Sequence, residues 1–173
     1  MRVKSVLSAI KRTVTPETLN QGITPYINGG EVYYIVIPPT SKYYLKNHFI
    51  LPSNIYDIKE LLQEPFVLSS SESAIRHQVN GLFQNNRIVP KIRMVSDSVI
   101  TATNLAIHGM GFSVSSASII KRIRRAPINL YPIDPDVMRI TYFIGIKKGR
   151  KISSNLRNLI DTFQRANLQA EIH

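Results

Sequence analysis

Serine side chains gather at two points where an expected strand is followed by an expected helix. The run Ser69 to Ser73 follows the apolar strand expected at Phe66 to Leu68. In the same way, Ser96 to Ser98 follows the strand expected at Lys91 to Val95. The first turn of a helix has free backbone N–H groups, which serine hydroxyls can cap and which also bind anions. These serines are therefore either plain helix caps, or parts of two helix N-termini that together bind a small carboxylate, sulfate or phosphate.

The second helix start opens the segment DSVITATNLAIHGMGFSVSS, which runs from Asp97 to Ser116. A helix is expected from Val99 to Ile107, and it has almost no polar face, so it should be buried or covered by a partner. Gly109 suits the left-handed position after a helix end, and Gly111 allows close approach of another backbone segment. Without a ligand, this segment is simply a helix, a turn and a strand of the core.

The residues that carry most enzyme chemistry are absent or scattered. The chain has no cysteine, which excludes disulfides, thiolate nucleophiles and cysteine-based zinc sites. Its four histidines form no metal-binding pair, and no nucleophile elbow or phosphate-binding loop is present. Asp134 and Asp136 flank Pro135 and are expected to set a turn. We therefore expect no enzyme activity, no metal and no cofactor.

Positive charge is the strongest feature of the composition, with a formal net charge of +11. The basic residues gather in three patches, Arg2 to Arg12, Lys121 to Arg125 and Lys147 to Lys151. Such patches either attract nucleic acid or form an inert basic surface. No aromatic RNA-binding motif or zinc knuckle accompanies them.

The sequence predicts an intracellular protein without a membrane segment. Lys11 and Arg12 interrupt the apolar residues near the N-terminus, which are too few for a signal peptide. No run approaches the roughly 20 apolar residues that span a bilayer. The lack of cysteine fits a reducing compartment, and we expect the cytoplasm.

Strands and helices alternate along the chain, which predicts an α/β fold with a largely parallel sheet. Residues 22–30 are expected to form a loop because of their glycines. Strands are expected at 31–37, 66–68, 91–95, 128–131 and 139–147, and helices at 1–14, 54–62, 71–85, 99–107, 117–124 and 153–166.

Several stretches in a fixed order carry a resemblance to a known family. The strand VYYIVIPP is followed by YDIKELLQEPFVL, then by IRHQVNGLFQNNRIVPKI and by the segment from Asp97 to Ser116. The stretch RITYFIGIKKGRKISSNLRNLIDTFQ comes last. Together they resemble the effector-binding domain of LysR-type transcriptional regulators, from about Gly22 to Arg165.

The resemblance implies a periplasmic-binding-protein type 2 fold, with two lobes built on mainly parallel sheets. Residues 1–64 would form a partial first lobe, residues 65–137 the second lobe, and residues 138–173 a return strand and helix that complete the first lobe. The family's winged helix-turn-helix has no counterpart, and residues 1–21 match the start of the first lobe poorly. The chain therefore resembles a truncated relative, in which DNA would be contacted only by a domain that this chain lacks.

The resemblance also implies a function. The chain would be a regulatory domain that binds a small, anionic effector between its lobes and works within a homo-oligomer. The alternatives are an interaction module that dimerises without ligand, and a basic protein that binds nucleic acid through Lys121 to Arg125. The residues that would line the second-lobe half of the ligand site are Ser69, Ser70, Ser71, Ser98, Thr101 and Phe112.

Overall fold

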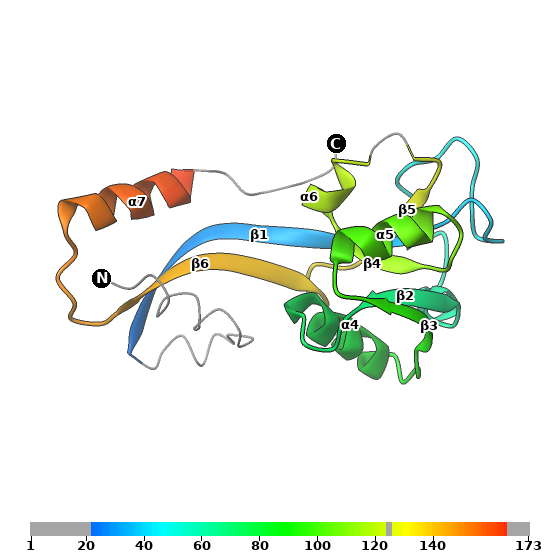
Figure 1. Ribbon diagram of the computed structural model, residues 1–173, viewed down its shortest axis with the longest axis horizontal. Coiled ribbons are helices and arrows are strands. Elements are labelled where there is room, and N and C mark those ends of the chain that lie inside the picture. The colour runs from blue at the N-terminus through cyan, green and yellow to red at the C-terminus, as the bar shows by residue number, and fades with distance from the viewer. Residues whose placement is uncertain (1–21, 124–125, 166–173) are drawn as a thin grey trace. The chain divides into compact units, whose positions relative to one another are not determined.

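The computed structural model describes residues 22–123 and 126–165 (Figure 1). The helix expected at 1–14, the basic patch Arg2 to Arg12 and the last two residues of the patch Lys121 to Arg125 lie outside these ranges. The chain divides into two compact units. Of the described residues, 31–139 belong to a larger unit, while 22–30 and 140–165 belong to a smaller one.

The larger unit is built on strand β1 (Ile23–Ile37), of which residues 31–37 lie in this unit. This strand pairs antiparallel with β4 (Ser113–Ser116) on one side and with β5 (Asn129–Pro132) on the other. Its run of β-branched side chains is typical of a central strand, and Ile35, Val36 and Ile37 are fully buried.

A second sheet of the larger unit has two parallel strands, β2 (Pro65–Ser69) and β3 (Lys91–Ser96). Helix α4 (Ala74–Asn85) connects them. The periodicity of the sequence places four apolar side chains of this helix inward, and the structure confirms it. These buried side chains are Ile75, Val79, Leu82 and Phe83.

Helix α5 (Val99–Ile107) follows β3 and ends as the glycines predict. Gly109 has a φ of +82°, its N–H donates to Ala106 O over 2.9 Å, and Met110 N–H donates to Leu105 O over 3.0 Å. These two bonds form a Schellman motif, which satisfies the last carbonyls of the helix. Gly111 then brings the chain against β2, where Phe112 N–H donates to Pro65 O over 2.8 Å.

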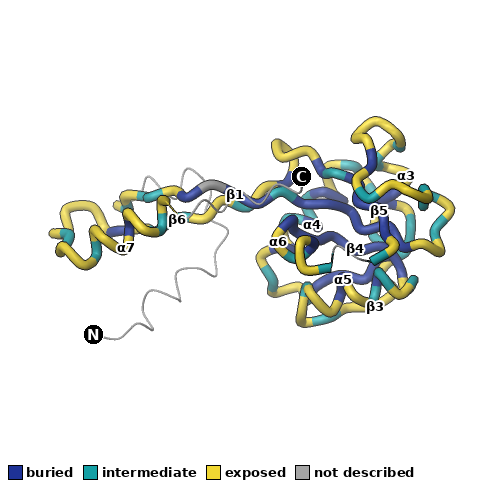
Figure 2. Tube along the Cα trace, turned by 90° about the horizontal axis from the view of Figure 1, so that it is seen from above, coloured by how far each residue is buried: buried dark blue, intermediate teal, exposed yellow. Residues whose placement is uncertain are grey.

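Two short helices complete the larger unit. Helix α3 (Ile58–Leu62) starts at Asp57, whose side chain accepts a hydrogen bond from Lys59 N–H over 2.9 Å. Helix α6 (Ala117–Ile120) follows β4 and is shorter than the expected helix. Figure 2 shows the buried residues of this unit gathered along β1, β4 and β5. One core cluster joins β1 and β5 to α5 and α6 and contains Tyr34, Val36, Ala106, Ala117, Ile120, Ile128 and Leu130.

The smaller unit contains the start of β1, most of β6 (Arg139–Lys147) and helix α7 (Ser154–Arg165). Strand β6 pairs with β1, and Asn28 Nδ2 donates a hydrogen bond to Phe163 O of α7. Ile146 and Ile160 are the buried apolar side chains of β6 and α7. The strand at 139–147 and the helix near the C-terminus agree with the expectations.

Two expectations about the strands need correction. The loop expected at residues 22–30 is wrong, because β1 already begins at Ile23. The glycines and Pro25 lower the β-propensity of this stretch, but pairing with β6 outweighs that preference. The expected parallel pairing holds for β2 and β3, whereas β4 and β5 run antiparallel to β1. Alternation of strands and helices does not determine which strand ends become neighbours.

The two compact units do not follow the expected lobes one to one, since residues 31–64 belong with residues 65–139 in the larger unit. The division into lobes at residues 64/65 and 137/138 stays a prediction. Within the ranges that the structure describes, no helix has both the length and the apolar character that crossing a membrane requires.

Tyr131 of β5 ties the loop before α3 to the sheet. Its hydroxyl lies 2.6 Å from Ser53 O and 2.9 Å from Tyr56 O, and its single proton is shared between these two carbonyls. Burial, followed by the negative charge of Asp57, raises the pKa of the Tyr131 phenol above its ordinary value of 10.0. The protonated phenol therefore stabilises the fold.

We expect Tyr131→Phe to lower the free energy of unfolding by about 1–2 kcal/mol, because two carbonyls lose their donor. The folded pKa lies above the unfolded one, so this contribution is complete below the unfolded pKa and is lost as the pH rises through the folded pKa. Urea denaturation at pH 8 and above pH 10 measures both effects. An equal alkaline loss of stability in wild type and variant would show that Tyr131 is not the group responsible.

Candidate functional site

The two serine-rich turns lie side by side at the carboxyl ends of β2 and β3. Ser69 is paired with Ser96 in the parallel register, and Ser70 N–H donates to Ser96 O over 3.0 Å. Helix α4 starts directly after the first strand and helix α5 directly after the second. The structure therefore brings together the two helix N-termini that the sequence singled out.

At the first turn, the serine hydroxyls largely bond to each other. Ser73 is the N-cap of α4, and its Oγ accepts from Arg76 N–H over 3.2 Å. The same Oγ donates its one proton to Ser70 O over 3.0 Å, so the 2.8 Å contact with Ser69 Oγ must use the proton of Ser69. Ser69 is buried and its proton is engaged, whereas Ser71 is exposed at the tip of the turn.

At the second turn, Ser98 caps α5 and leaves a hydroxyl proton available. Its Oγ accepts from Thr101 N–H over 3.3 Å, and its own N–H donates to Ser96 Oγ over 3.2 Å. The proton of Ser98 has no acceptor within the described ranges, and both Ser98 and Thr101 are exposed. This turn therefore presents hydroxyl donors to the solvent.

Phe112, the one apolar residue of the expected site, is a core residue in this structure. Its side chain is only 2% exposed. Its ring lies edge-on to Phe66 at 5.8 Å and to Tyr43 at 6.3 Å between ring centroids. Its contacts are therefore with these two rings, and it supports the loop that carries Tyr43.

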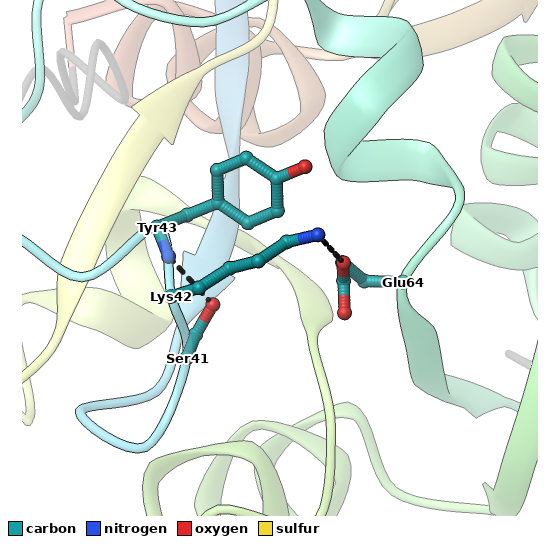
Figure 3. A network of polar contacts seen from close by, with 4 residues as sticks. All are labelled: Ser41, Lys42, Tyr43 and Glu64. Atoms are coloured by element: carbon teal, nitrogen blue, oxygen red, sulfur yellow. Dashed lines mark hydrogen bonds and ion pairs between the residues drawn. The ribbon is translucent and has the colours of Figure 1, made fainter.

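That loop holds a small polar network (Figure 3). Lys42 Nζ lies 3.3 Å from Glu64 Oε1 and 4.9 Å from the centroid of the Tyr43 ring. The hydrogen bond to Glu64 raises the pKa of the Lys42 ammonium, with a smaller contribution from Tyr43. Because Lys42 is exposed and paired with Glu64, this cation is already neutralised by a carboxylate.

Arg76, unlike Lys42, is a buried cation without a carboxylate partner in the described ranges. It is not among the site residues that the sequence predicted. It is only 9% exposed, and Nη1 donates to Ser69 O over 2.6 Å while Nε donates to Asn80 Oδ1 over 2.9 Å. Both partners are uncharged. A signal was present in the sequence, since Arg76 stands in the first turn of a helix, where the helix dipole disfavours a cation.

The described histidine and acidic side chains form no metal centre. No three histidine, aspartate or glutamate side chains in the described ranges are close enough to hold a metal ion. His48, His77 and His108 are exposed and far apart in the sequence. Asp134 Oδ1 accepts from Asp136 N–H over 2.9 Å, which confirms the expected role of these aspartates in a turn.

The comparisons with known proteins identify the family. The family model of the LysR substrate binding domain matches residues 46–167, which is more than half of the chain. The chain therefore belongs to the LysR substrate binding domain family, and its fold is of the periplasmic-binding-protein type 2 kind. Domains of this family are the ligand-sensing parts of transcription regulators and are not enzymes. No curated protein matches the sequence.

Solved structures share this fold at low sequence identity. The CcmR regulatory domain of Synechocystis PCC6803 in complex with 2-PG is 16% identical, with a TM-score of 0.69 over 91% of this chain and 72% of that one. The BenM effector binding domain with its effector benzoate is 18% identical, with a TM-score of 0.65, over 95% and 74%. The QuiR effector binding domain with shikimate is 15% identical, with a TM-score of 0.64, over 95% and 77%. This chain covers 52% of full-length BenM.

Proposed function

We propose that this chain senses a small molecule with a carboxylate group, bound at the carboxyl ends of β2 and β3. The observation that carries the proposal is the pairing of Ser69 with Ser96, which sets the N-termini of α4 and α5 next to each other. The N-termini of two helices carry partial positive charge, and two of them at the carboxyl ends of neighbouring strands favour the binding of an anion.

The backbone supplies donors for such an anion. The N–H groups of Ala74 and Ile75 in α4, and of Val99 and Ile100 in α5, have no acceptor within the described ranges. The first turn of neither helix contains an acidic residue that could take the place of a ligand. Glu72 and Asp97 precede the two caps, and both are exposed.

The side chains proposed for the site divide into two groups. Ser70, Ser71, Ser98 and Thr101 would hydrogen-bond the ligand, because they lie at the two turns and Ser71, Ser98 and Thr101 are exposed. Ser69 would support these hydroxyls through its hydrogen bond to Ser73. Phe112 lies beside the start of β2, where it is packed against Tyr43 and Phe66, so it would stiffen the domain and would not contact the ligand. The first group keeps the expectation from the sequence, whereas Ser69 and Phe112, which were expected to line the site, are both buried.

The ligands of the structural neighbours support a carboxylate. Two of the three neighbours described above hold benzoate or shikimate, and both ligands are carboxylates. We also propose that the domain acts in the cytoplasm within a homo-oligomer, and that DNA is contacted by another domain. Membership of a family of transcription regulators supports these partners.

A thermal-shift screen tests the proposed function. The domain is heated with a series of carboxylates, each at millimolar concentration, and with the primary amide of each as an uncharged control. A ligand present at 100 times its dissociation constant stabilises the fold by about 2.7 kcal/mol. We expect at least one carboxylate to raise the melting temperature and its amide to have little effect. If no carboxylate stabilises the domain, the proposal is wrong.

We expect Ser98→Ala and Thr101→Val to separate capping from ligand binding. Ser98→Ala removes the cap of α5, so it should cost about 1 kcal/mol of stability and also weaken the carboxylate found in the screen. Thr101 caps nothing with its side chain, so Thr101→Val should weaken the carboxylate by several-fold and leave stability unchanged. Denaturation and calorimetric titration measure the two quantities. Unchanged affinity in both variants would remove these hydroxyls from the site.

Self-association without ligand is a second candidate function, and the exposed edge of β3 favours it. This strand pairs only with β2 in the described part of the sheet, and it exposes large apolar side chains. Ile92 is 41% exposed and Val95 is 51% exposed. Such an edge can pair with a strand of another chain. A ligand-free dimer in analytical ultracentrifugation, combined with no response to any carboxylate, would favour this function over the first.

A further inference from the structure

The guanidinium of Arg76 is placed where a cation is costly to hold. It is 9% exposed, it stands in the first turn of α4, and no carboxylate within the described ranges lies within 4.0 Å of it. Burial of a charge without a counter-ion and proximity to a positive helix end both destabilise the charged form. An anion bound at the same turn would offset both effects.

One of the three guanidinium nitrogens of Arg76 makes no hydrogen bond within the described ranges. Nη1 and Nε donate to Ser69 O and Asn80 Oδ1, whereas Nη2 has no partner within the described ranges. Every buried side-chain nitrogen and oxygen in those ranges does have a partner. Nη2 therefore is not a buried atom, and it reaches solvent although most of the side chain is buried.

We propose that Arg76 selects the charge of the ligand, with Nη2 donating a hydrogen bond to one oxygen of its carboxylate. This inference rests on the proposed function and adds a specificity-determining residue to it. The bonds to Ser69 O and Asn80 Oδ1 hold the guanidinium in one orientation, so the donor is positioned before the ligand arrives. A neutral amide could accept the same hydrogen bond through its carbonyl oxygen, but it carries no negative charge and would leave the buried cation uncompensated.

The structural alternative is that Arg76 only fastens the turn at Ser69. In that case, replacing it would lower stability and would weaken a carboxylate and its amide equally. The ratio of the two affinities therefore distinguishes the roles, because a general loss of structure lowers both affinities together.

The test uses sodium benzoate and benzamide as probes on the full chain. The affinity for each is measured by NMR titration, following backbone amides at the starts of α4 and α5 and the side-chain Nε–H of Arg76. In wild type we expect saturable shifts with benzoate and at least tenfold weaker binding of benzamide. In Arg76→Gln we expect benzoate to bind about 10–100-fold more weakly and the preference over benzamide to disappear.

Two further variants keep the test decisive if Arg76→Gln folds poorly. Arg76→Lys retains the charge and should recover part of the preference for benzoate. Asn80→Ala removes the partner of Nε, so it should lower stability while most of the preference remains. If wild type prefers benzoate and Arg76→Gln keeps that preference, the inference about Arg76 is wrong and the proposed function stands. If wild-type amides at α4 and α5 show no saturable response to benzoate, the inference about Arg76 is overturned, whereas the proposed function is overturned only if no carboxylate in the thermal-shift screen stabilises the domain.

Discussion

Asn129→Ala should unfold this domain at a clearly lower denaturant concentration, with a loss of about 3–5 kcal/mol. Asn129 is fully buried in β5, and its side chain makes three hydrogen bonds to the loop after β1. Oδ1 accepts from Leu45 N–H over 2.5 Å, and Nδ2 donates to Leu45 O over 2.9 Å and to His48 O over 2.5 Å.

The size of this effect follows from what the truncation leaves behind. The alanine side chain can make none of the three hydrogen bonds, so one N–H group and two C=O groups of the loop lose their partners. Each buried polar group left without a partner costs about 1–3 kcal/mol, with partial recovery through water. The loop would then be held to β5 mainly by two backbone bonds, from Leu51 N–H to Leu130 O over 2.8 Å and from Leu130 N–H to Phe49 O over 2.7 Å.

Asn86→Ala is the matched control for Asn129→Ala. Asn86 lies at the end of α4, is half-buried, and its Nδ2 makes one bond of 2.8 Å to Leu82 O. It should cost about 1 kcal/mol or less. Urea denaturation monitored by circular dichroism measures both variants. Equal losses for Asn86→Ala and Asn129→Ala would show that the three loop bonds contribute little.

Gly111→Ala should be the second strongly destabilising substitution, with a loss of about 3 kcal/mol or more. Gly111 has a φ of +140°, a conformation that residues with a Cβ rarely adopt. A Cβ atom at this position would also lie 2.6 Å from Pro65 O, which is a backbone atom of β2. Relief of this contact requires β2 and the turn before β4 to move apart, which would break the bond between Phe112 N–H and Pro65 O.

Substitutions at two other glycines separate the cost of backbone strain at a positive φ from the cost of the steric clash at Gly111. Gly149 has a φ of +77°, but a Cβ atom added there would meet nothing within 4 Å, so Gly149→Ala should cost only about 1 kcal/mol. Gly81 lies in α4 with open space around it, so Gly81→Ala should stabilise the helix by about 0.5–1 kcal/mol. Thermal unfolding of the three variants ranks their stabilities. A Gly111→Ala protein as stable as Gly149→Ala would contradict the proposed clash.

Local features of the fold could be read from the sequence, since they depend on neighbouring residues. The apolar face of α4, the cap at Ser98 and the helix end at Gly109 follow from spacing and from the chemistry of single residues. The expected parallel pairing holds for β2 and β3, and it places the two serine-rich turns next to each other. The family resemblance is likewise confirmed by the match over residues 46–167.

Features that depend on distant contacts could not be read in this way. Strand β1 extends back to Ile23 only because β6 pairs with it. Asn129 anchors a loop that lies 81 to 84 residues away in the sequence, and no local pattern marks that role. The burial of Arg76 and Phe112 also depends on how the elements pack. Whether Lys121 to Arg125 binds nucleic acid stays a prediction.

The most direct measurement of the central claim is hydrogen exchange of individual backbone amides with and without the most stabilising carboxylate from the screen. We predict that the carboxylate slows exchange at the free N–H groups where α4 and α5 begin, namely those of Ala74, Ile75, Val99 and Ile100. The primary amide of the same compound should change them little. Slower exchange elsewhere in the domain, with these four amides unchanged, would contradict a carboxylate site at the ends of β2 and β3.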